Sequence, residues 1–133
     1  MTYYCDIRKE EDDMFVVIFP DMPNVITYGS SKENALQMAK EALEGTMEVD
    51  IDYTLGIPEP KYKKGYPITV DPRIAFAVEL RHARADRTQQ DVAAAVGMTY
   101  QQYQRLENPR KTNPTISTIH KLEQALGCSF LAF

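Results

Sequence analysis

The sequence predicts an α+β protein in two parts: an antiparallel sheet with one helix across it, followed by an all-helical domain. Three observations support this class. Strand-like runs fill most of the first 30 positions, and a segment with helical apolar spacing follows them. Near residues 88–106, two short capped segments are joined by a glycine-containing turn. A chain of 133 residues can hold two domains of about 60 residues each.

Three strands are expected first, with a fourth strand further along the chain. Residues 3–8 alternate in polarity, as in a half-buried strand. Residues 14–19 form a β-branched and aromatic run, and residues 25–28 form a third strand that Gly29 ends. Residues 66–70 form the short fourth strand. The expected order is therefore β-β-β-α(-β).

One helix should lie across this sheet. Ser30 is expected to cap it, with Glu33 completing a capping box, and Gly45 can kink or fray it. Four apolar residues recur at helical spacing and should face the sheet: Leu36, Ala39, Leu43 and Met47.

The domain boundaries follow from composition. Residues 54–67 contain three prolines, two glycines and three lysines, which is typical of a linker or a long arm. We therefore expect a first domain over residues 1–55, a linker over 56–70 that includes the short strand, and a helical domain over 71–133.

The helical domain contains the most specific motif in the chain. Residues 88–96 and 99–106 each begin at a threonine that can cap a helix, and Gln102 completes a T-x-x-Q capping box. Gly97 lies where the chain must leave the first helix through a left-handed residue. This spacing is that of a helix-turn-helix, which places its second helix in the DNA major groove. A further helix follows N-P-T and ends at A-L-G.

This segment resembles the Cro/repressor type of helix-turn-helix domain. It departs from that pattern at Asp86 and Arg87, where a Gly and an apolar residue are usual, and at Pro109, which replaces a Gly. These departures concern the loops and leave the helices as expected.

Candidate DNA contacts follow from positions in the motif. Side chains in the first two turns of the second helix can reach base edges, with Arg suited to guanine and Gln to adenine. Side chains that begin the first helix or follow the second can contact phosphates. The predicted set is Gln89, Thr99, Tyr100, Gln101, Gln102, Arg105, Arg110, Lys111, Thr112 and Asn113. A single such domain buries too little surface for tight binding, so a homodimer or higher homo-oligomer on a pseudo-palindromic operator is expected.

The first domain carries two further motifs, F-P-D-x-P at residues 19–23 and A-L-x-x-A-K-E-A-L at residues 35–43. With the strand pattern, they resemble the HicB antitoxin family, in which a front domain followed by a helix-turn-helix is a known order. The resemblance implies a partial ribonuclease-H-like sheet. It also implies a HicA-type toxin partner, an mRNA-cleaving ribonuclease that the antitoxin neutralises, and repression of the antitoxin's own operon through the rear domain.

The charge distribution fits two different partners. Residues 1–70 hold seven Lys or Arg against thirteen Asp or Glu, a balance of −6, whereas residues 71–133 hold eight against six, a balance of +2. The rear can approach phosphate, and the acidic front can cover the positive surface of an RNA-cleaving toxin. Acidic turns and two aromatic anchors supply the candidate toxin contacts: Glu10, Glu11, Asp12, Asp13, Phe15, Asp21 and Tyr28.

Other classes of function have less support in the sequence. No paired metal motif, Gly-rich phosphate loop or Ser-His-Asp arrangement is present, so we expect no enzyme, metal site or cofactor. Without a long apolar run or a signal-peptide pattern, a cytoplasmic protein with Cys5 and Cys128 reduced is expected. Two alternatives stay open: a transcriptional regulator whose front domain senses a small ligand, and a front-domain nuclease targeted by the rear domain.

Overall fold

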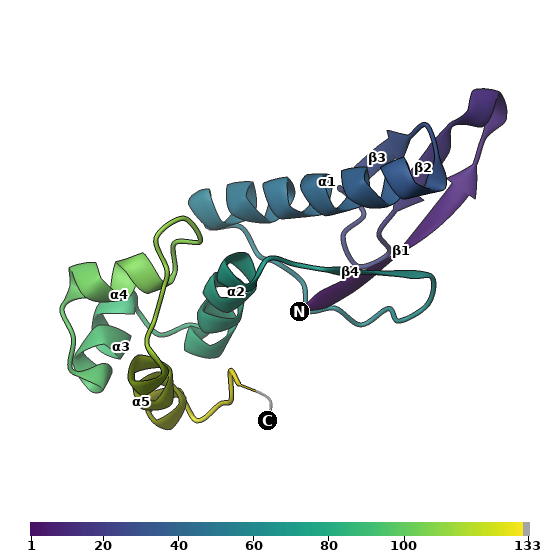
Figure 1. The fold of residues 1–133 in the computed structure, drawn as a ribbon. Coiled ribbons are helices and arrows are strands. Elements are labelled where there is room, and N and C mark those ends of the chain that lie inside the picture. Colours follow the sequence, from purple (N-terminus) through teal and green to yellow (C-terminus); the bar gives the residue numbers. More distant parts are fainter. Residues whose placement is uncertain (132–133) are drawn as a thin grey trace. The chain divides into compact units, whose positions relative to one another are not determined.

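The computed structural model describes residues 1–131 and divides the chain into two compact units (Figure 1). Unit 1 comprises Met1–Asp71, and unit 2 begins at Pro72. Of the apolar C-terminal segment 128–133, Ala132 and Phe133 lie outside the described residues. Each unit has its own buried apolar core, so each is described by itself.

Unit 1 contains the four expected strands. They are β1 (Thr2–Lys9), β2 (Phe15–Ile18), β3 (Ile26–Gly29) and β4 (Tyr66–Thr69). The sheet order is β3-β2-β1-β4, and all three neighbouring pairs are antiparallel. A short 3₁₀ helix, η1 (Glu11–Asp13), forms the turn between β1 and β2.

Helix α1 (Lys32–Asp52) crosses one face of the sheet, as Figure 1 shows. It begins one residue later than predicted, because the oxygen of Ser31 rather than Ser30 accepts the Asn34 N–H, at 3.0 Å. The expected kink at Gly45 is wrong, since the helix continues unbroken to Asp52. Its buried apolar face repeats every four residues: Ala35, Ala39, Leu43 and Met47.

The segment 56–70, expected to be a linker, belongs to the sheet unit instead. Strand β4 pairs with β1, and the carboxylate of Asp21 accepts backbone N–H groups of Lys61 and Tyr62 at 2.8 and 2.9 Å. Proline and glycine indicate irregular backbone, but they do not indicate whether that backbone leaves the domain. Unit 1 therefore extends to Asp71 rather than ending at residue 55, and the helical unit begins at Pro72, next to the predicted start at residue 71.

Over its described residues, 72–131, unit 2 contains four helices: α2 (Pro72–Arg84), α3 (Gln89–Val96), α4 (Tyr100–Leu106) and α5 (Ile116–Leu126). One shared core joins α2 to the other three helices. The core residues are Leu80, Val92, Ala93, Tyr103, Leu106 and Leu122. The small side chain of Ala93 is 2% exposed, and α3 packs closely on α4.

Candidate nucleic-acid interface and protein-docking surface

The turn between α3 and α4 has the local geometry that its sequence predicts. The Thr88 hydroxyl oxygen accepts the Asp91 N–H at 3.0 Å and caps α3. Gly97 ends this helix in the left-handed region, with φ 84°. At the start of α4, the Thr99 hydroxyl oxygen accepts the Gln102 N–H at 3.1 Å. In return, the Gln102 side-chain oxygen accepts the Thr99 N–H at 3.0 Å, which completes the capping box.

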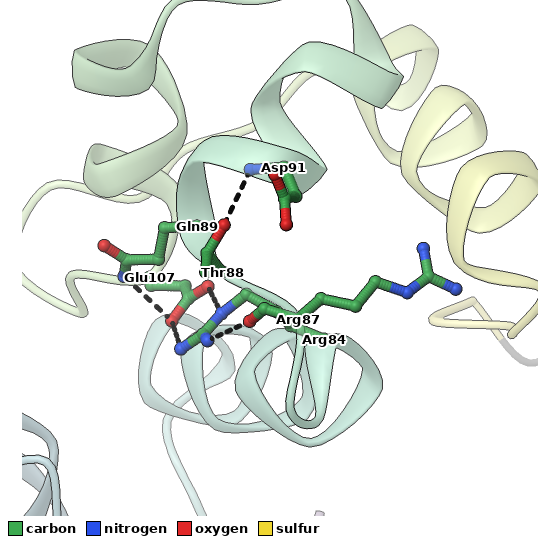
Figure 2. Close-up of polar contacts among 6 residues, drawn as sticks. All are labelled: Arg84, Arg87, Thr88, Gln89, Asp91 and Glu107. Atoms are coloured by element: carbon green, nitrogen blue, oxygen red, sulfur yellow. Dashed lines mark hydrogen bonds and ion pairs between the residues drawn. The ribbon is translucent and has the colours of Figure 1, made fainter.

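A nearly buried ion pair holds the helix-turn-helix to the helix before it (Figure 2). The guanidinium of Arg84 donates through Nε and Nη2 to both carboxylate oxygens of Glu107, at 2.7 and 3.0 Å. Arg84 also donates through Nη1 to the Arg87 carbonyl at 2.8 Å, and Gln89 Nε2 donates to Glu107 Oε1 at 3.2 Å. The Arg84 and Glu107 side chains are 16% and 4% exposed. One carboxylate therefore connects α2, α3 and the end of α4.

This polar cluster changes the properties of its neighbours. Hydrogen bonding to Glu107 raises the pKa of Arg84, so the guanidinium stays charged. Burial raises the pKa of Tyr103, and the adjacent Glu107 carboxylate raises it further. The sequence reasoning missed Arg84 and Glu107. The available signal was that Glu107 follows the core residue Tyr103 by four positions, which places a charge on the buried stripe of α4.

The predicted base-reading side chains lie on one short, firmly capped helix. Gln101, Gln102 and Arg105 are exposed on α4, and Tyr100 is half-buried. Gln104 is also exposed there, although the sequence reasoning did not select it. The structure thus leaves the polar side chains of α4 accessible while its apolar residues face the core.

The predicted phosphate contacts are only partly available. Arg110, Lys111 and Asn113 are exposed in the loop after α4. Thr112 is 1% exposed, so the prediction that its side chain contacts phosphate is wrong. Gln89 is half-buried and already donates one side-chain hydrogen bond to Glu107, as shown above.

Pro109 is accommodated in this loop without a glycine. The side chain of Asn108 accepts the Arg110 N–H at 3.0 Å, and its carbonyl accepts the Thr112 N–H at 2.8 Å. These bonds form a compact turn in which Thr112 points inward. Asp86 and Arg87, the two departures before α3, directly follow Ala85. Ala85 adopts a left-handed φ of 55°, where a glycine would be less strained.

In unit 1, the predicted toxin contacts do not form one patch. The strand register pairs Phe15 with Gly29, whose α-carbon packs against the backbone of Ala35 in α1. Side chains alternate along a strand, so Phe15 lies on the α1 side of the sheet and Tyr28 on the opposite side. Asp21 is half-buried and holds residues 61 and 62.

The side of the sheet opposite α1 exposes two apolar side chains of β3. Tyr28 is 64% exposed, and Ile26, which the sequence reasoning missed, is 68% exposed on the same face of β3. Residues 10–13 are exposed at the turn between β1 and β2, where Lys9 forms an ion pair with Asp13 at 3.7 Å. The strand register places Tyr28 opposite Val16, near the acidic turn, and Ile26 opposite Ile18, at the other end of β3.

Comparison with known families divides the chain in the same way. Residues 2–76 match the HicB-like antitoxins of bacterial toxin–antitoxin systems. The chain therefore belongs to the HicB-like antitoxin family. Residues 79–133 of this HicB-like antitoxin match a helix-turn-helix family. The family assignment confirms the predicted resemblance and the predicted α+β class with a helix-turn-helix rear domain.

Several proteins are similar to this HicB-like antitoxin over most of their length. Antitoxin HicB 1 of Photorhabdus laumondii is 30% identical over 96% of this chain and 83% of the relative. Antitoxin HicB of Escherichia coli strain K12 is 26% identical over 96% of this chain and 94% of the relative. The crystal structure of the N-terminal domain of Burkholderia pseudomallei antitoxin HicB is 20% identical, with a TM-score of 0.47, over 53% of this chain and 99% of that one.

The described part of this HicB-like antitoxin shows no cluster of three His, Cys, Asp or Glu residues that could hold a metal ion. Within residues 1–131, no helix is both long and apolar enough to cross a membrane. Cys5 and Cys128 are free thiols, and burial raises the pKa of Cys5 to about 11. The Cys5 thiol is therefore protonated and unreactive at neutral pH.

Proposed function

We propose that this HicB-like antitoxin neutralises a HicA-type, mRNA-cleaving toxin through unit 1 and represses its own operon through unit 2. One observation carries the proposal: a family-typical sheet unit and a helix-turn-helix with an exposed, capped second helix occur in a single chain. In this proposal, the protein acts by binding and catalyses no reaction.

The DNA half of the proposal rests on the exposed side chains of α4. Arg105 can donate a pair of hydrogen bonds to guanine in the major groove. Gln101 can make a paired contact to adenine, donating one hydrogen bond and accepting the other. Lys111, in the exposed loop after α4, supplies charge to a phosphate. Two copies of unit 2 on a pseudo-palindromic operator would double this small contact area, and we propose such a homo-oligomer.

The toxin half rests on charge and on the side of the sheet opposite α1. An enzyme that cleaves mRNA needs a positive surface for the phosphates of its substrate, and the acidic turn at residues 10–13 complements such a surface. Tyr28 adds exposed apolar area near that turn, and Ile26 adds more at the other end of β3; aromatic side chains commonly anchor an interface. Phe15 and Asp21 contribute less, because one faces α1 and the other is bound within the unit.

Co-expression tests the toxin half of the proposal, and a DNA-binding assay tests the operator half. A short reading frame beside the gene should encode a small basic protein. The full chain should co-purify with that protein, and the complex should cleave no RNA. The full chain should also bind DNA from upstream of the gene pair. Failure to bind that neighbour would count against the antitoxin role. Uptake of a small molecule by unit 1, with no toxin binding, would favour the ligand-sensing regulator instead.

A further inference from the structure

The capping box at the start of α4 fixes the orientation of one exposed side chain, that of Gln102. Its side-chain oxygen accepts the backbone N–H of Thr99 at 3.0 Å, and its own backbone N–H is held by the Thr99 hydroxyl at 3.1 Å. A backbone N–H can only donate, so the carboxamide must present its oxygen to Thr99. The amide nitrogen, with two N–H donors, then lies on the other side of the group.

Turning the carboxamide over would remove this arrangement. It would place the Gln102 Nε2 donors against the Thr99 N–H, which is itself a donor, and would leave the first turn of α4 without that cap. The orientation is therefore set by the protein before any DNA is bound. Within residues 1–131, Nε2 of Gln102 has no hydrogen-bond partner, and the residue is exposed.

We propose that Gln102 contacts DNA as a hydrogen-bond donor only and selects a base that presents an acceptor in the major groove. Guanine offers the neighbouring acceptors O6 and N7, and thymine offers O4. Adenine offers N7 but places its N6 donor beside it, and cytosine offers only its N4 donor, so a side chain that only donates favours guanine or thymine. The paired contact to adenine that the sequence suggests for glutamine also needs the oxygen, which is turned toward Thr99. This inference rests on the proposed DNA binding by unit 2.

Gln101 provides a natural contrast on the same helix. It is exposed and takes no part in the capping box. Its carboxamide can present either donor or acceptor and can make the paired contact to adenine. Two adjacent glutamines are thus expected to select different bases because only one of them is held by the backbone.

The substitution Gln102→Glu separates the cap from the contact. A glutamate carboxylate accepts the Thr99 N–H just as the amide oxygen does, so the capping box persists. It has no N–H donor, however, and it prefers the cytosine N4 donor over guanine or thymine. We expect an unchanged melting temperature and roughly tenfold weaker binding to the natural operator. At one base position, selection should change from guanine or thymine to cytosine.

Two further variants complete the experiment, which uses the full-length chain, random-sequence binding-site selection and thermal melting. Gln124→Glu makes the same charge change at an exposed position of α5 and measures the general effect of charge. Gln102→Ala removes both cap and donor, so it should lower the melting temperature and remove the preference at the same position.

The outcomes are distinct. Adenine selected in preference to guanine at that position by the wild-type chain would overturn the inference, because only the paired contact, which uses the oxygen, favours adenine over guanine. Equal weakening on all sequences would mean that the same donor contacts a phosphate and reads no base, which also overturns it. A lower melting temperature for Gln102→Glu would show that the oxygen is not held by the cap. Absence of specific binding by the wild-type chain would instead remove the DNA-binding role on which the inference rests.

Discussion

The two units carry their candidate binding surfaces in different ways. In unit 2, the side chains that we assign to base reading project from one helix of seven residues, which is fixed by a capping box and followed directly by the buried Glu107. In unit 1, the candidate toxin contacts come from a hairpin turn and an edge strand and depend on strand pairing. The DNA surface is set by caps between neighbouring residues and by one ion pair between residues 23 positions apart, whereas the protein-docking surface is set by strand pairing.

This difference suggests that the two activities respond differently to mutation. A surface held by local caps and one ion pair should be lost as a unit when the ion pair is broken. A surface spread over a turn and a sheet edge should lose affinity in smaller steps, because each side chain contributes separately.

The largest effect should come from separating the units at Asp71. Residues 1–71 should bind the toxin but not operator DNA, because residues 1–70 carry a balance of −6 and no recognition helix. Residues 72–133 should bind DNA, more weakly than the full chain if dimer contacts lie partly in unit 1. Measuring both folded fragments against both ligands tests this. Toxin binding by the full chain, but not by a folded unit 1, would place toxin recognition elsewhere.

The second prediction concerns the ion pair of unit 2. Glu107→Ala leaves the guanidinium of Arg84 nearly buried without its partner, which should destabilise this unit by about 3–5 kcal/mol. DNA binding should be lost while toxin binding by the same full-length chain persists. Urea unfolding measures the free energy. Adding Arg84→Met should restore much of it, and no recovery would argue that Glu107 stabilises the unit in another way.

Local signals made most of unit 2 predictable from the sequence. The caps at Thr88 and Thr99 and the left-handed Gly97 each involve residues within four positions, so the sequence contains both partners side by side. The predicted N-cap of α1 was wrong by one position, because either Ser30 or the adjacent Ser31 could cap the helix and Ser31 does so. Asn34 rather than Glu33 completes that cap, because its side-chain oxygen accepts the Ser30 N–H at 3.0 Å.

Long-range contacts explain what the sequence did not show. Asp21 accepts hydrogen bonds from residues 40 and 41 positions away, so its structural role was invisible to pattern reasoning. The separation of Phe15 and Tyr28 onto opposite faces needs the strand register. The burial of Thr112 depends on the turn that Asn108 forms, where Pro109 replaces the usual glycine.

The third prediction tests base reading by Arg105, which should be separable from folding because this side chain is exposed. Arg105→Ala should weaken operator binding by about 1–3 kcal/mol and relax selection at one base position. The melting temperature should stay unchanged. Binding-site selection with wild-type and variant chains provides the measurement, and an identical base preference would remove Arg105 from the base-reading set.

The fourth prediction compares two neighbours in the loop after α4. Lys111→Ala should weaken binding about equally on all sequences and reduce the slope of log affinity against log salt by about 0.9. Thr112→Val is the matched control, because the Thr112 side chain is buried and its hydroxyl has no hydrogen-bond partner in the described part of the chain. It should leave the slope unchanged. Equal slopes for all three proteins would contradict the phosphate contact of Lys111.

The smallest effect is expected at the end of unit 2, where Glu123 holds the chain after α5. Its carboxylate accepts the backbone N–H groups of Phe130 and Leu131, at 2.8 and 3.3 Å. These bonds favour the charged form and lower the pKa of Glu123 below its usual 4.5. A lowered pKa in the folded state stabilises this contact above pH 4.5, and the stabilisation is lost as the pH falls through the lowered value.

Phe130 packs against Phe76 of α2, with ring centroids 5.3 Å apart, so protonation of Glu123 should loosen this packing without unfolding the unit. In an NMR titration of the full chain, the Phe130 amide resonance should shift with an apparent pKa below 4.5. The variant Glu123→Gln keeps an acceptor oxygen but cannot titrate, so the shift should disappear while Phe130 stays in place. A Phe130 resonance that titrates equally in both proteins would show that another carboxylate controls this end of the chain.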